Sequence, residues 1–121
     1  METIAQILIG FIAFEHFCFL WLEMFAWQTA GKKAFKNMIP DELFEPTKVL
    51  AANQGLYNGF LAAGLIWTFF ISDITWKTNI SVFFLGCVII AGIYGGVTAG
   101  KKIIVIQAIP AIIAIIFVLL C

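Results

Sequence analysis

Residues 15–29 read EHFCFLWLEMFAWQT and residues 48–67 read KVLAANQGLYNGFLAAGLIW. Both stretches are apolar enough to cross a lipid bilayer, yet each has polar side chains in its interior. We call these side chains the polar cluster: Glu15, His16, Glu23, Asn53, Gln54, Tyr57 and Asn58. An ionisable group at membrane depth costs about 2.5–3.5 kcal/mol and usually marks a functional site. We therefore expect any function of this chain to lie in the polar cluster.

The overall composition also indicates a membrane protein. The chain has 121 residues, of which 63% are hydrophobic, and a mean hydropathy of +1.05. A soluble domain of this length would need far more polar surface. The formal net charge is zero, which gives no sign of a nucleic-acid partner. All seven basic residues are lysines, so the usual bidentate clamp for phosphate and carboxylate groups is absent from the sequence.

Four segments are long enough to span about 30 Å of hydrocarbon as helices. They lie at approximately 3–27, 47–72, 79–99 and 103–121. The sequence therefore predicts an all-α fold, an integral membrane four-helix bundle that forms a single transmembrane domain over residues 1–121. In the first connection, Pro40, Asp41 and Glu42 favour a helical turn.

The lysines predict how the bundle is oriented. If the helices alternate in direction, the first and third connections share one side of the membrane, and the second connection has only Lys77. The lysines on the first side are Lys32, Lys33, Lys36, Lys48, Lys101 and Lys102. Because positive charge is retained in the cytoplasm, both termini should lie outside and the two lysine-rich connections inside. We expect a multi-pass protein of the bacterial cytoplasmic (inner) membrane, with the lipid bilayer as its surroundings.

Small residues at four-residue spacing predict close helix packing. Gly55 and Gly59 form such a stripe in the second segment, and Gly92, Gly96 and Gly100 form another in the third. Stripes of this kind let helix backbones approach closely. Packing within one bundle is the favoured interpretation, and association of identical chains through one stripe is the alternative. We expect a homo-oligomer.

Helical geometry places the polar cluster on two facing arcs. Glu15, His16 and Glu23 share one side of the first helix. Counted from the lysine-rich end, Glu23 is level with Asn53 and Gln54, while Glu15 and His16 are near Tyr57 and Asn58. This arrangement predicts a polar pocket in the membrane that opens to the cytoplasm and binds a small amphipathic or lipophilic ligand.

Other functions remain open at this point. A metal site is not expected, because Glu15 and Glu23 are about 12 Å apart along the helix axis, and no cofactor is expected either. A purely structural network is a second interpretation, but hydrogen bonds between membrane helices contribute only about 0.6 kcal/mol each. Acid–base or conjugation chemistry on the ligand, and proton-coupled transport by an oligomer, are further alternatives.

The strings at residues 15–29 and 48–67 resemble a family of small bacterial four-helix integral membrane proteins that is known as a domain of unknown function. This resemblance covers nearly the whole chain and implies the fold without an activity. Ala52-Asn53-Gln54 is similar to a string in the membrane-associated proteins of eicosanoid and glutathione metabolism. That second resemblance implies a homotrimer with ligand sites between subunits. The glutathione-binding members depend on arginines, and this chain has none.

Overall fold

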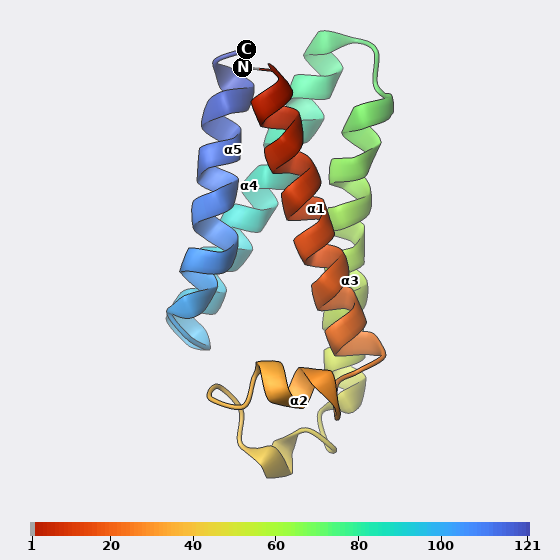
Figure 1. Cartoon of the computed structure of the whole chain (residues 1–121), viewed down its shortest axis with the longest axis vertical. Coiled ribbons are helices and arrows are strands. Elements are labelled where there is room, and N and C mark those ends of the chain that lie inside the picture. Colours follow the sequence, from red (N-terminus) through yellow and green to blue (C-terminus); the bar gives the residue numbers. More distant parts are fainter. Residues whose placement is uncertain (1) are drawn as a thin grey trace.

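The computed structural model describes residues 2–121, which fold into helices joined by short connections (Figure 1). The α-helices are α1 (Glu2–Met24), α2 (Ala30–Ala34), α3 (Lys48–Trp67), α4 (Ile74–Thr98) and α5 (Ile109–Leu119). Three short segments complete them: the 3₁₀ turns η1 (Asp41–Leu43) and η2 (Thr68–Phe70), and the π-helical segment η3 (Ile104–Ala108). Residues 2–121 contain no strand, so the prediction of an all-α fold is confirmed.

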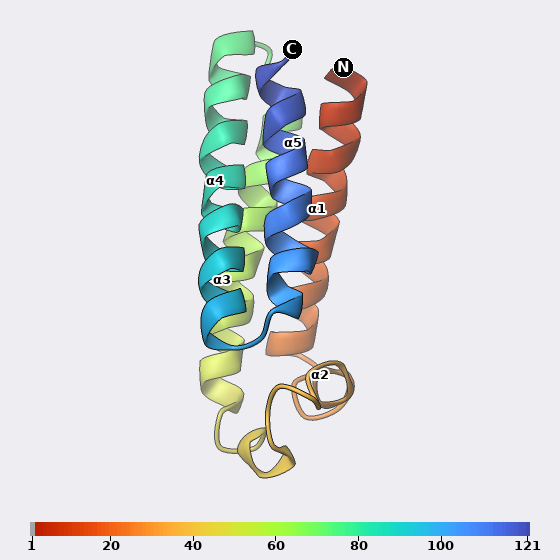
Figure 2. The same cartoon turned by 90° about the vertical axis from the view of Figure 1, so that its left-hand side faces the viewer.

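The four long helices run side by side as two antiparallel pairs (Figures 1 and 2). One pair is α1 with α3, and the other is α4 with η3 and α5. The start of α1 and the end of α5 lie at one end of the molecule. The connection that contains α2 lies at the other end, together with the turn between α4 and η3 (Figure 1). We call these the terminal end and the lysine end.

The shared hydrophobic core occupies the half of the molecule near the terminal end. Its buried members are Ala5, Ile9, Ile12, Ala13, Leu65, Leu85, Val88, Ala111, Ala114 and Val118. Towards the lysine end the two pairs diverge, and α2 lies across the foot of the α1–α3 pair (Figure 1). The divergence leaves the polar half of α1 with one close helical neighbour, α3.

Glycines determine how closely the two helices within each pair approach each other. A Cβ atom on Gly55 would lie 2.7 Å from Met24 Cγ and 3.0 Å from Glu23 Cβ, so α1 and α3 touch here nearly backbone to backbone. On α4, a Cβ atom on Gly92 would lie 2.7 Å from the backbone nitrogen of Ala108. Gly59, Gly96 and Gly100 also face close neighbours, namely Leu20, Ile104 and Met38. Each stripe therefore makes contacts within one chain.

Two helix boundaries differ from the predicted ones. The first helix ends at Met24 rather than at residue 27, because the Ala26 amide bonds back to the Trp21 carbonyl (3.1 Å) and unwinds the last turn. The third long helix begins at Ile74 rather than at residue 79. Its start is fixed by Asp73, whose Oδ1 accepts a hydrogen bond from the Trp76 amide at 2.9 Å.

For the other two long segments, the observed helix boundaries differ less from the predicted ones. The second ends as α-helix at Trp67 and continues as the 3₁₀ turn η2 to Phe70, near the predicted end at residue 72. The last contains the π-helical segment η3, which ends two residues before Pro110. Proline lacks the amide hydrogen that an α-helix needs, so a wider turn before it is a typical adjustment. The helical turn predicted near Asp41 is confirmed by η1.

Candidate functional site

The three ionisable residues of the polar cluster lie along one side of α1, in the half that faces the diverging end. His16 is fully buried, while Glu15 and Glu23 are half-buried. They continue the buried face of α1 that contributes Ile9 and Ile12 to the core. The same helical face is thus apolar near the terminal end and polar near the lysine end.

Glu23 pairs with a different partner from the one predicted. Asn58 Nδ2 donates a hydrogen bond to Glu23 Oε1 at 2.6 Å. The sequence placed Glu23 level with Asn53 and Gln54, and that level is nearly right, because Glu23 Cβ lies against Gly55, but the two amides are on other faces of α3. The reason is the close contact at Gly55, which brings Glu23 next to the glycine stripe, with Asn58 at its edge.

The other polar residues of α3 do not face α1. Asn53, Gln54 and Tyr57 are exposed, and Tyr57 retains 54% of its accessible surface. Tyr57 lies two turns before Gly64, which packs against the Phe84 ring of α4. Two turns return a helix to almost the same face, so Tyr57 lies on the side of α3 that would meet α4 if the pairs did not diverge. The predicted facing of two polar arcs is therefore wrong for these three residues.

His16 and Glu15 have polar atoms that are buried and unpaired. His16 Nδ1 donates to the carbonyl of Ile12 at 2.8 Å, one turn back on α1. In a neutral imidazole with the proton on Nδ1, Nε2 is an acceptor. His16 Nε2 and Glu15 Oε2 are both buried without a hydrogen-bond partner among residues 2–121. A buried polar atom left unpaired costs about 1–3 kcal/mol, so a donor from elsewhere would be stabilising here.

The connection between α1 and α3 folds into a compact unit of its own. The ring of Trp27 packs against Phe35 and Phe44, with centroids 5.7 and 4.9 Å away, and Phe44 is 1% exposed. Trp27 Nε1 also donates to Thr47 Oγ1 at 3.2 Å. We call residues 25–47 the lysine-end loop. The packing of these three rings against one another was not predicted from the sequence, although three large rings in a lysine-rich connection are a usable signal of local packing.

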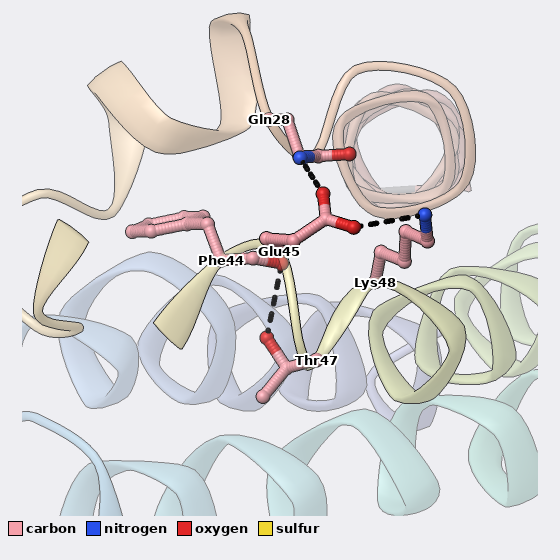
Figure 3. Close-up of polar contacts among 5 residues, drawn as sticks. All are labelled: Gln28, Phe44, Glu45, Thr47 and Lys48. Carbon is pink, nitrogen blue, oxygen red and sulfur yellow. Dashed lines mark hydrogen bonds and ion pairs between the residues drawn. The ribbon is translucent and has the colours of Figure 1, made fainter. Parts of the chain in front are cut away.

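Polar contacts fasten the end of the lysine-end loop to the start of α3 (Figure 3). Glu45 accepts hydrogen bonds from Gln28 Nε2 and, at 3.1 Å, from Lys48 Nζ. Thr47 Oγ1 donates to the carbonyl oxygens of Leu43 and Phe44. These contacts connect the first part of the loop to its last residues and to the start of α3.

An open hollow of about 620 Å³ lies against the lysine-end loop. It is lined by Gln28, Thr29, Ala30, Lys32, Lys33, Lys36 and Asp41. A smaller hollow of about 130 Å³ lies at the terminal end, near the ion pair between Glu2 and Lys77. No residue of the polar cluster lines either hollow. From the sequence, the lysines predicted only the orientation of the chain. Their position around a hollow was not predicted.

The contacts of Glu45 predict a pH dependence of the lysine-end loop. Hydrogen bonds from Lys48 and Gln28 hold the pKa of the Glu45 carboxyl below its usual range. Because this pKa is lower in the folded state, the contribution is present above the usual glutamate value of about 4.3 and is lost as the pH falls through the folded pKa. We expect hydrogen–deuterium exchange in residues 25–47, corrected for its intrinsic pH dependence, to accelerate below about pH 4.

Two variants check the assignment to Glu45. Glu45→Gln should show fast exchange already at pH 7 and little further change on acidification. Glu42→Gln removes a neighbouring exposed carboxylate that forms no ion pair within residues 2–121, and it should behave as wild type. Equal effects of the two variants would mean that Glu45 does not hold the loop.

Two comparisons with known proteins give a match. Residues 10–119 match the family model described as "Protein of unknown function (DUF1304)". The chain is 35% identical over 117 residues to "Uncharacterized protein YpaA" of Lactococcus lactis, with 96% of this chain and 97% of the relative covered. No solved structure gives a significant match. The chain therefore belongs to the DUF1304 family of proteins of unknown function.

Proposed function

We propose that this chain is a multi-pass protein of the bacterial inner membrane that binds a small amphipathic or lipophilic molecule. The ligand lies beside Glu15 and His16, where the α1–α3 pair and the α4–α5 pair diverge. The observation that carries the proposal is the fully buried His16, whose Nε2 has no partner within the described chain.

The outer surface supports the membrane part of the proposal. α1 and α4 are each long and apolar enough to cross a membrane, and α5 is a shorter apolar helix. Large apolar side chains are exposed on all four long helices, for example Phe14 (67%), Phe60 (59%), Ile90 (71%) and Leu119 (64%). Soluble monomers rarely expose contiguous apolar surface on this scale. In a bilayer, lipid would cover these side chains, so their apolar surface would not be exposed to water.

Lysine distribution supports a cytoplasmic lysine end. Six of the seven lysines belong to the lysine-end loop, the start of α3 or the turn after α4, whereas Lys77 lies near the terminal end. The positive-inside rule then gives both termini outside. The amides of Asn53 and Gln54 are exposed near the lysine end, and a second copy of the chain would cover them, so the proposal includes a homo-oligomer.

The unpaired atoms define the chemistry of the ligand. His16 Nε2 accepts a hydrogen bond, so the ligand must offer an O–H or N–H group. The ring of Phe19 lies edge-on to His16, with centroids 5.4 Å apart, and provides an apolar wall beside the acceptor. Glu15 Oε2 is a second polar atom at the next position of the helix. A molecule with one hydroxyl- or amine-bearing end and an apolar body fits both features.

His16→Leu tests this site. The substitution keeps a side chain of moderate size but removes the acceptor, so a molecule bound through Nε2 should be lost. We expect mass spectrometry of small molecules that co-purify in mild detergent to show at least about a tenfold drop in occupancy, the equivalent of one lost buried hydrogen bond. When both proteins are free of ligand, the variant should unfold at the wild-type temperature or above, because an unpaired buried polar group has been replaced by an apolar one.

Cys18→Ala provides the matched control. Cys18 is half-buried on the same helix, two residues and therefore about 200° around the axis from His16. This variant should keep the co-purifying molecule. Equal ligand content in wild type, His16→Leu and Cys18→Ala, or no enriched molecule in any of them, would contradict the proposal.

A further inference from the structure

The hollow at the lysine-end loop has the charge of an anion site. Three lysines, Lys32, Lys33 and Lys36, line it against one acid, Asp41. Within residues 2–121 the ion pairs are Lys48 with Glu45 and Lys77 with Glu2, so none of the three lining lysines is neutralised by a carboxylate. About 620 Å³ is enough room for a small polar group.

These lysines belong to a folded segment, and Lys32 also has a side-chain contact of its own. Lys32 Nζ lies 5.9 Å from the centroid of the Phe44 ring, in the range of a cation–π contact. The start of α2 is anchored to the end of α1, where the Gly31 amide bonds to the Ala26 carbonyl at 2.6 Å. Gly31 is buried, and a Cβ atom there would lie 2.9 Å from that same carbonyl oxygen. The lysines of α2 therefore sit on a folded unit, not on a free connection.

The orientation of α2 indicates where the anion comes from. α2 lies across the foot of the bundle, roughly at right angles to the long helices (Figures 1 and 2). If α1 and α4 cross a bilayer, this direction is that of the membrane plane, and the hollow lies at the level of the lipid headgroups. We infer that the hollow binds the phosphate group of an anionic phospholipid. This inference rests on the membrane part of the proposed function and is independent of the ligand beside His16.

The lining also favours one kind of headgroup. Lysine binds phosphate as a point charge, without the bidentate geometry of arginine, so the site selects for charge more than for shape. Asp41 accepts hydrogen bonds and repels a second negative charge. A headgroup with one phosphate charge and free hydroxyls, such as phosphatidylglycerol, matches the three lysines and the single carboxylate.

A pair of exposed lysines tests the site. The full chain is purified in a neutral detergent, and its unfolding temperature is followed as phosphatidylglycerol is added. Wild type should be stabilised by phosphatidylglycerol but not by phosphatidylcholine, whose headgroup has no net charge. Lys33→Gln/Lys36→Gln should weaken the apparent affinity for phosphatidylglycerol about 25-fold, since each of the two lysines near an anionic membrane surface contributes on the order of a fivefold change.

Lys101→Gln/Lys102→Gln is the matched control. Both lysines are exposed, lie at the same end of the molecule and are outside the hollow, and the loss of charge is identical. We expect the control to weaken the affinity less than about threefold. Equal losses of affinity in the two double variants would overturn the inference, because they would show that the lipid is attracted diffusely to the whole lysine end.

Soluble anions distinguish the two sources of phosphate. Inorganic phosphate and glycerol 3-phosphate, at the same concentration as the lipid, should leave the unfolding temperature unchanged. Stabilisation by either to the same extent as by phosphatidylglycerol would overturn the lipid source and assign the hollow to a soluble phosphate compound. His16→Leu should bind phosphatidylglycerol as wild type does, so the failure of one proposal is visible separately from the failure of the other.

Discussion

Gly92→Ala in α4 is expected to lower the free energy of unfolding by about 1–3 kcal/mol, although it adds one methyl group. The added Cβ atom would lie 2.7 Å from the backbone nitrogen of Ala108 and 3.0 Å from the Cβ atoms of Ala108 and Gln107. The backbone at Ala108 cannot move aside for the added methyl group as the end of a flexible side chain could. The change therefore forces α4 and η3 apart along their contact.

Gly86→Ala is the control on the same helix. A Cβ atom at Gly86 has no heavy atom within 4 Å. Alanine has a higher helix propensity than glycine by up to about 1 kcal/mol, so this variant should be at least as stable as wild type. Unfolding in detergent micelles, followed by circular dichroism, gives both values. A Gly92→Ala protein as stable as the Gly86→Ala protein would mean that α4 and η3 are not in close contact.

Much of the fold is determined by local patterns that the sequence displays. Long apolar segments, the cap at Asp73 and the turn at Pro40-Asp41 act within a few residues of each other. For that reason the all-α class and the turn at η1 were predictable. The helix ends were less predictable, because the apolar residues continue past Met24 to Trp27, whereas the backbone leaves the helix at this point and the Ala26 carbonyl accepts from the Gly31 amide.

The candidate site shows where sequence reasoning stops. The periodicity of α3 groups Asn53, Gln54, Tyr57 and Asn58 on one arc, and matching two polar arcs face to face is an economical assumption. Packing decides otherwise, since backbone approach at Gly55 gives α1 the glycine side of α3. Only Asn58, at the edge of that side, reaches Glu23. The divergence of the helix pairs depends on contacts distant in sequence, and no local pattern encodes it.

The lysine-end loop was missed for a related reason. Its rings at Trp27, Phe35 and Phe44 are separated by eight and nine residues of irregular chain, where helical periodicity gives no guidance. Their meeting depends on the return of the chain at Gly31 and on the contacts of Thr47 and Glu45. Only with those contacts in place do Lys32 and Lys33 of α2 and the following Lys36 line a common hollow.

The hydrogen bond between Asn58 and Glu23 predicts that each single variant at these positions is less stable than the double variant. Asn58→Leu should lower the free energy of unfolding by about 1–3 kcal/mol, because it leaves the Glu23 carboxyl without its 2.6 Å partner in a half-buried site. Glu23→Leu should cost a similar amount by leaving the Asn58 amide unpaired. The double variant Glu23→Leu/Asn58→Leu should be close to wild type or above it, because both polar groups are then gone. Asn53→Leu, at an exposed amide of the same helix, should change stability little.

The coupling energy from these four unfolding measurements also decides which residues belong to the proposed ligand site. A coupling of about 1–3 kcal/mol assigns Glu23 to the contact between α1 and α3, since only interacting residues depart from additivity on this scale. The hydrogen-bonding capacity left for a ligand then belongs to Glu15 and His16, whose buried oxygen and nitrogen have no partner within the described chain. Additive single effects would contradict this division. They would show that Glu23 is not engaged by Asn58 in solution, and Glu23 would then be available to bind the ligand alongside Glu15 and His16.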